Sequence, residues 1–198
     1  MIEVIEPPYR KCGDTARFES VALGPDDKVY AIVSGGAARY VAVINTDLFI
    51  ENVLSLEGSE VGPACLTGID VDKHGSIYVT DPCAEVMVQI YDSNGLYLSG
   101  FGRHDSGFDN FSHPSSIAVM PTGEMWIVDS IRQVVSRFSP DGKFVSYIGG
   151  KGSHVGALNY PSGVATDGED RLFVLERAGN RYQCFRIESD EEVSTTEH

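Results

Sequence analysis

The amino-acid sequence predicts an all-β fold, a propeller built of four four-stranded units, and two observations carry this prediction. First, one eight-residue pattern occurs four times, reading DDKVYAIV, HGSIYVTD, TGEMWIVD and EDRLFVLE, and a repeat of about 48 residues is typical of propeller blades. Second, no stretch has the 3.6-residue apolar period of an amphipathic helix. A sheet of four short strands cannot bury both faces alone, whereas sheets stacked around an axis bury each other.

Each unit repeats the same order of strands and turns, and the eight-residue pattern is its second strand. The first strands are FESVAL from Phe18, LTGIDV from Leu66, PSSIAV from Pro114 and PSGVAT from Pro161. The third strands are YVAVIN from Tyr40, VMVQIYD from Val86, QVVSRFS from Gln133 and RYQCFRI from Arg181. Turns such as DSNG and SPDG then lead to the fourth strands LYLSGFG and KFVSYIGG. Their Gly, Asn and Asp residues tolerate the positive φ angles of tight turns.

The four blades are predicted at residues 13–58, 59–105, 106–150 and 151–187, within one domain of residues 1–187. The last unit lacks a fourth strand, because the chain continues as ESDEEVSTTEH. This acidic, apolar-poor segment, residues 188–198, is predicted to be a disordered tail. The strand-like Ile2–Ile5 is expected to pair with the last unit, which would remove an exposed edge.

Two ring arrangements remain open at this point. The four blades either close as a compact ring or form half of a larger ring that another copy of the chain completes. The second arrangement would expose the apolar faces of the first and last sheets, and it therefore predicts a homo-oligomer.

Three segments resemble NHL repeats: LTGIDVDKHGSIYVTD, HPSSIAVMPTGEMWIVDS and YPSGVATDGEDRLFVLERAGNRYQCF. The resemblance covers residues 62–187 well and residues 13–58 weakly, because Val33 stands where the second strand usually ends in Asp. It implies a β-propeller, usually six-bladed, that recruits another protein. The family also favours an Arg after the acidic residue, and only Glu176 with Arg181 keeps that pattern. The resemblance thus implies a structural ion pair in the last blade alone.

The charge balance argues against two classes of partner. With 15 Lys and Arg against 29 Asp and Glu, the formal charge is −14, so neither nucleic acid nor an anionic membrane is an expected partner. No apolar run approaches the roughly 20 residues that a membrane-spanning helix needs. The chain starts without a secretory leader pattern, and its four cysteines have no C-x-x-C spacing. A cytoplasmic location is therefore expected.

The loops between blades and those joining second to third strands share one face of a propeller, and loops on a rigid scaffold commonly carry function. The binding-face candidates are Asp81, His104, His113, Asp129, His154, Glu176 and Arg177. The histidines of several such loops could together bind zinc. Peptidyl-hydroxyglycine lyases with NHL-like propellers place a His after the proline that opens the first strand. Here Ser115 and Ser162 follow Pro114 and Pro161, which argues against lyase activity.

Asp70 is the unusual residue of the predicted channel, because the equivalent positions hold Ala22, Ala118 and Ala165. It either accepts hydrogen bonds from nearby backbone amides or, with Asp72, binds a metal ion such as calcium or zinc. Metal ligation would make the chain a lactonase- or lyase-like enzyme, which is the alternative function.

Cys65 and Cys83 are predicted to lie close together, with free thiols as the expected state and a disulfide or a metal site as alternatives. Cys184 is predicted to lie in the core. The leading functional prediction is a non-catalytic scaffold or sensor without a cofactor, which binds another protein through its loop face.

Overall fold

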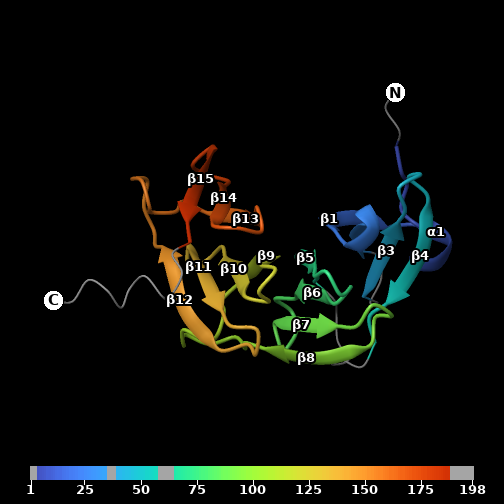
Figure 1. Cartoon of the computed structure of the whole chain (residues 1–198), viewed down its shortest axis with the longest axis horizontal. Coiled ribbons are helices and arrows are strands. Elements are labelled where there is room, and N and C mark those ends of the chain that lie inside the picture. The colour runs from blue at the N-terminus through green and yellow to red at the C-terminus, as the bar shows by residue number, and fades with distance from the viewer. Residues whose placement is uncertain (1–3, 35–38, 58–64, 188–198) are drawn as a thin grey trace.

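The computed structural model describes residues 4–34, 39–57 and 65–187. A short α-helix, α1 (Tyr9–Cys12), and a 3-10 turn, η1 (Pro25–Asp27), are the helical elements of these ranges. All other elements are strands, and they form four antiparallel sheets. Since consecutive sheets pack face to face around a common axis, the predicted all-β propeller architecture is confirmed (Figure 1).

Each sheet is one blade and takes its strands from one repeat of the sequence. The first blade contains β1 (Arg17–Leu23), β2 (Val29–Ser34), β3 (Tyr40–Ile44) and β4 (Ile50–Ser55). The second contains β5 (Gly68–Val71), β6 (Ile77–Thr80), β7 (Val88–Tyr91) and β8 (Tyr97–Phe101). The third contains β9 (Pro114–Val119), β10 (Met125–Asp129), β11 (Val134–Phe138) and β12 (Phe144–Gly149). The fourth contains β13 (Pro161–Thr166), β14 (Arg171–Glu176) and β15 (Arg181–Arg186).

The turns form because a short polar side chain binds the backbone amides of its own turn. Asp92 accepts hydrogen bonds from the amides of Asn94 and Leu96, both at 2.9 Å, and Gly95 follows with φ at 86°. Only a residue without a Cβ adopts that angle at little cost. The D-x-N-G pattern therefore specifies the tight turn that connects β7 to β8.

Buried side chains between consecutive blades form three apolar clusters. The first and second blades share Ile32, Val41, Ile69, Ile77, Val79 and Tyr91. The second and third share Met87, Val88, Phe111, Ile117, Met125, Ile127 and Phe138. The third and fourth share Trp126, Val128, Val135, Leu158, Leu172 and Val174. Because no blade has a core of its own, each is stable only against its neighbours.

The first and last blades are not packed on each other as consecutive blades are. β1 packs on β5, β5 on β9 and β9 on β13, and no contact of that extent joins the described strands of the fourth blade to those of the first. Figure 1 shows the resulting arc, which is open between β13 and β1. Whether another copy of the chain completes this arc remains a prediction.

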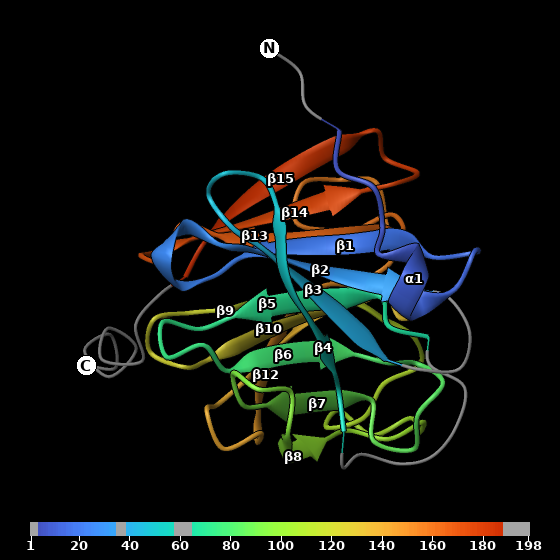
Figure 2. The ribbon, with the colours of Figure 1, turned by 90° about the vertical axis from the view of Figure 1, so that its right-hand side faces the viewer.

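The two ends of the arc differ in how they are covered. On the first blade, Cys12 of α1 and nearby Ala16 pack on Val33 and Ala42, and Figure 2 shows α1 lying against this blade. On the fourth blade, Tyr182 is 69% exposed. The prediction that Cys184 lies in the core is wrong: its side chain is exposed. It shares a face with Tyr182 on β15, and no further blade covers that face among the described residues.

The fourth blade has three strands among the described residues, so the expected closing strand is not observed at Val4 and Ile5. Neither residue belongs to a strand, and Val4 is 84% exposed. Ile2 and the predicted tail at residues 188–198 lie outside the described residues.

Candidate functional site

The face that carries the inter-blade loops is organised by buried carboxylates. Asp81, Asp129 and Glu176 occupy the same place, directly after or at the end of the second strand of their blades, and each is at most 1% exposed. A buried carboxylate is stable only if it is paired and hydrogen-bonded. In each blade at least one donor is a backbone amide that precedes the first strand, and other donors lie elsewhere in the chain.

Asp129 holds the loop between the second and third blades. Its carboxylate accepts hydrogen bonds from the amides of Ser112 at 2.6 Å and His113 at 3.3 Å, and the Arg132 guanidinium lies 3.6 Å away. Arg132 then donates to the carbonyls of Gly107 and Asn110, both at 2.8 Å. Carboxylate and guanidinium together bind the loop at several points, which fixes its conformation.

Glu176 and Arg181 repeat this arrangement one blade further on. Glu176 accepts hydrogen bonds from the Asn159 amide at 2.8 Å, from Arg181 at 2.6 Å and from Gln183 at 2.8 Å. Arg181 also donates to the carbonyls of Ser153, His154 and Ala157. Burial opposes the ionisation of Glu176, but the hydrogen bonds from Arg181, Gln183 and Asn159 outweigh it, so its pKa is lower than that of an ordinary glutamate.

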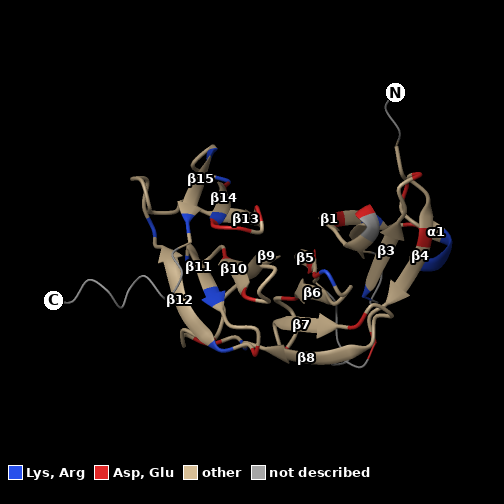
Figure 3. Ribbon diagram, viewed as in Figure 1, with Lys and Arg blue, Asp and Glu red and all other residues tan. Residues whose placement is uncertain are grey.

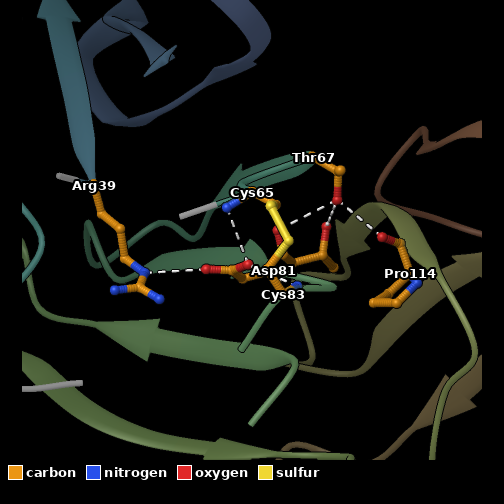
Figure 4. The surroundings of a disulfide bond; sticks show 7 residues. Arg39, Cys65, Thr67, Asp81, Cys83 and Pro114 are labelled. Carbon is orange, nitrogen blue, oxygen red and sulfur yellow. Dashed lines mark hydrogen bonds and ion pairs between the residues drawn. A yellow bond between two sulfur atoms is a disulfide. The ribbon is translucent and has the colours of Figure 1, made fainter. Parts of the chain in front are cut away.

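Asp81 has different partners, which Figure 4 shows together with the nearby disulfide. Its carboxylate accepts hydrogen bonds from the amides of Cys65 at 3.2 Å and Cys83 at 3.1 Å. Its charge is paired with Arg39 of the first blade at 3.0 Å. The expectation of an ion pair in the last blade alone is therefore wrong, because Arg132 and Arg39 supply the pairing from other positions in the sequence.

Cys65 and Cys83 form a disulfide, with their Cα atoms 5.5 Å apart. Their predicted proximity is confirmed, whereas the expectation of free thiols is wrong. The strand register brings the two residues together, because Val71 pairs with Ile77. Continued along the hairpin, this register places Cys65 directly opposite Cys83.

The pKa of Glu176 leads to a prediction about acid stability. Because its pKa is lower in the folded protein, ionised Glu176 stabilises the fold above its unfolded-state pKa of about 4.3, and this contribution is lost as the pH falls through the lower folded-state value. We expect Glu176→Gln to destabilise the protein at pH 7 and the difference from wild type to shrink towards pH 3. Urea unfolding across this range measures it. The control is Asp170→Asn, whose pair with Arg186 is exposed and should contribute little at either pH. A difference that stays constant with pH would contradict the assignment.

The other binding-face candidates lie on the same loops without forming one cluster. His104, His154 and Arg177 are exposed, and His113 is partly buried with its amide bound to Asp129. Among the described residues, three potential metal ligands come together only at Cys65, Asp81 and Cys83. The histidines therefore do not form the zinc site that their loops suggested.

Exposed apolar side chains on these loops were not predicted from the sequence. They are Phe108 at 65%, Ile131 at 64%, Val155 at 89% and Tyr160 at 54% exposed. Phe108 stacks on Tyr147 of β12, with ring centroids 5.8 Å apart and an interplanar angle of 9°. Beside this stack lies a hollow of about 310 Å³ lined by Arg132, Ser136, Gly149 and Gly150 among others. The sequence did contain one signal of this exposure: Phe108 is an apolar residue in a loop that begins at Gly102 and contains Gly107.

The axial cavity, of about 460 Å³, is lined by residues of β1, β5, β9 and β13. Asp70 lines it together with Ala22, Ala118 and Ala165, which occupy the equivalent positions of the other blades. The Asp70 carboxylate accepts hydrogen bonds from the amides of Val71 at 2.8 Å and Val119 at 2.7 Å. Burial raises the pKa of Asp70 in spite of these two hydrogen bonds.

A metal ion at Asp70 and Asp72 does not fit the side chains present. Each oxygen of the Asp70 carboxylate already accepts a hydrogen bond from a backbone amide. Asp72 instead accepts hydrogen bonds from the amides of His74 and Ser76 and from the Tyr78 hydroxyl. Among the other lining residues the alanines offer no side-chain oxygen and Asp167 is paired with Arg171, whereas calcium takes six to eight oxygen ligands.

Comparison with solved structures places this geometry in a fold class. A protein of unknown function from Bacteroides thetaiotaomicron superimposes with a TM-score of 0.64 at 18% identity, covering 86% of this chain and 47% of that one. A gluconolactonase from Xanthomonas campestris gives 0.63 at 17% identity, covering 88% and 59%. Virginiamycin B lyase from Staphylococcus aureus gives 0.56 at 16% identity, covering 89% and 57%. The chain is a β-propeller protein. At these identities the likeness concerns the fold alone.

Sequence comparison finds two mammalian proteins that are similar to part of this chain. Rat peptidylglycine alpha-amidating monooxygenase is 29% identical over 142 residues, and the mouse protein is 27% identical over the same length. The match covers 66% of this chain and 14% of each relative, so the propeller corresponds to a small part of those proteins. No protein-family model matches the chain. Within the described ranges, no helix is long and apolar enough to cross a membrane.

Proposed function

We propose that this propeller is a non-catalytic, NHL-type binding module that recruits another protein through the loops of its third and fourth blades. The observation that carries the proposal is the exposure of four large apolar side chains in loops of the same face, Phe108, Ile131, Val155 and Tyr160. Exposed apolar surface on loops that a rigid scaffold presents is typical of an interaction site.

The loops that present these side chains are held before any partner binds. Phe108 lies in the loop that Arg132 holds through the carbonyls of Gly107 and Asn110. Val155 lies in the loop that Arg181 holds through the carbonyls of Ser153, His154 and Ala157. A preorganised loop loses less conformational entropy on binding, so more of the contact energy contributes to affinity.

The charge distribution supports a protein partner over a nucleic acid. Lys and Arg are interspersed with Asp and Glu over the four blades rather than gathered on one of them (Figure 3). A phosphate backbone requires a continuous basic surface, and the net charge of −14 opposes one.

The test is affinity capture with two matched double variants. Phe108→Ser with Val155→Ser removes one aromatic and one aliphatic side chain from the proposed surface. Phe49→Ser with Leu98→Ser removes the same kinds of side chain from exposed positions elsewhere, 69% and 56% exposed. We expect a partner that wild type and the second variant recover equally, and that the first variant recovers at least tenfold less. Circular dichroism and thermal melting check that both variants fold. An identical set of recovered proteins for all three would contradict the proposal.

The alternative is a lactonase- or lyase-like enzyme with calcium or zinc in the axial cavity. Its support is the fold shared with a gluconolactonase and a lyase, and the donor atoms around Asp70 weigh against it. Elemental analysis and a melting shift on adding calcium or zinc would revive this alternative if either metal were retained or stabilising.

A further inference from the structure

The hollow beside the Phe108–Tyr147 stack contains a buried polar group without a partner. Ser136 of β11 lines this hollow of about 310 Å³ and is only 6% exposed. Its hydroxyl makes no hydrogen bond to any residue that the structure describes. Buried hydroxyl groups are nearly always hydrogen-bonded, because leaving one without a partner costs free energy. The Ser136 hydroxyl is therefore positioned to bind a group that enters the hollow.

Several other side chains that line the hollow are aromatic or apolar. Tyr147 lies directly opposite Ser136 in the neighbouring strand, and Phe108 stacks on Tyr147 with ring centroids 5.8 Å apart. Phe108 also stacks on Phe144 at 5.6 Å, so its ring is held on the sheet from two sides. Val134 lines the hollow from the same face of β11 as Ser136. Rings of this kind bind another aromatic ring well, through offset or edge-to-face contacts.

The charge of the hollow favours a neutral occupant. Among the described residues that line it, Arg132 alone is charged. Its guanidinium lies 3.6 Å from the Asp129 carboxylate and donates to the carbonyls of Gly107 and Asn110. A lysine or arginine of a partner would be repelled by Arg132, and a carboxylate would gain little because Asp129 already balances the charge.

We infer that the hollow binds one tyrosine side chain of the partner protein, an inference that rests on the proposed function. A phenol combines a ring that contacts Phe108 and Tyr147 with a hydroxyl at its tip that pairs with Ser136. Phenylalanine would leave the Ser136 hydroxyl unpaired, and the N–H of tryptophan lies at the side of a larger ring. The volume is at the lower end of that of ligand pockets, which suits a single side chain. Tyrosine is also among the residues that contribute most to the affinity of protein interfaces.

Two soluble probes test the site without the partner. N-acetyl-tyrosinamide carries the phenol, and N-acetyl-phenylalaninamide has the same ring without the hydroxyl. Each is titrated into the isotope-labelled full chain, and NMR follows the backbone amides of Gly149 and Gly150, which line the hollow. We expect wild type to bind the tyrosine probe about fivefold more tightly than the phenylalanine probe, the effect of one additional hydrogen bond.

Three variants assign the two halves of the site. Ser136→Ala removes the hydroxyl and should bind both probes equally, as tightly as wild type binds the phenylalanine probe. Ser115→Ala is the matched control, because it removes another buried hydroxyl without a partner from a residue that does not line the hollow. It should keep the difference between the probes. Phe108→Ala should weaken both probes alike, since it removes a ring and leaves Ser136 in place. Thermal melting checks that each variant folds.

Three results would overturn the inference. The first is that the amides of Gly149 and Gly150 do not shift with either probe up to its solubility. The second is that Ser136→Ala still prefers the tyrosine probe. The third is tighter binding of N-acetyl-tryptophanamide than of the tyrosine probe, which would make the occupant an indole.

These results are separate from the test of the proposed function, because no partner is present in the titrations. Binding of the probes together with a failed capture experiment would leave the site standing without its proposed role. Successful capture together with probes that do not bind would mean that the partner uses other contacts of the loop face.

Discussion

Asp129→Ala is expected to lower the free energy of unfolding by about 3–5 kcal/mol, the cost of leaving a buried charge without its partner. The substitution removes the acceptor for the amides of Ser112, His113, Ile131 and Arg132. It also leaves the Arg132 guanidinium, whose side chain is 20% exposed, without its counter-ion. Urea unfolding followed by circular dichroism measures the loss.

Two further variants distinguish the contribution of the Asp129 carboxylate to stability from that of the loop that contains its donors. Asp105→Ala changes an exposed residue of the same loop and should stay within about 0.5 kcal/mol of wild type. Asp129→Ala combined with Arg132→Ala should cost less than the sum of the two single losses, because the double variant leaves no unpaired charge. An Asp129→Ala protein as stable as wild type would show that the loop does not depend on this carboxylate.

The blades could be predicted from the sequence because the signals that make them are local. A turn such as DSNG positions its acceptor, Asp92, within four residues of its donors. Alternating apolar residues then fix which side of each strand is buried. Because the same pattern occurs in four repeats, a single irregularity such as Val33 did not change the predicted fold.

The restraints between blades could not be predicted, because their partners are distant in sequence. Arg39 and Asp81 are 42 residues apart, and only the stacking of the first blade on the second brings them together. The sequence pattern of Glu176 and Arg181, in which the arginine follows the acid by five residues, also failed to identify Arg132. Arg132 pairs with Asp129 from only three residues away. The burial of Asp81, Asp129 and Glu176 could not be predicted for a related reason: a polar residue after a strand is exposed or buried according to the loop that covers it.

The repeat pattern contains no information about α1, about whether the outer face of β15 is covered, or about the exposure of apolar residues in the loops. α1 lies outside the repeats, so nothing in them indicated that Cys12 would cover Val33. Cys184 follows the alternation of a core strand, yet its face is uncovered because β15 belongs to the end blade. Phe108 is exposed at a loop tip, where a pattern that equates apolar with buried gives the wrong answer.

Phe138→Ala is the second substitution expected to have a large effect, again about 3–5 kcal/mol. Phe138 is fully buried, and its ring lies 4.8 Å from Phe101, 5.4 Å from Phe111 and 5.8 Å from Phe144, measured between centroids. Phe101 belongs to the second blade and Phe111 to the loop between the blades, so truncation leaves a cavity at the place where the two blades meet. Phe138→Leu fills part of that cavity and should lose less.

Phe108→Ala is the matched control, since it removes the same ring from an exposed position that stacks on Tyr147. Aromatic pairs contribute about 0.5–1.5 kcal/mol beyond burial, so this variant should lose about 1 kcal/mol or less in the same unfolding experiment. If instead Phe108→Ala were as destabilising as Phe138→Ala, the exposed stack would be part of the fold and not a surface kept for a partner. If Phe138→Ala cost little, the blades would not depend on their shared core. The pair of measurements thus distinguishes aromatic residues that join the blades from those left free to contact another protein.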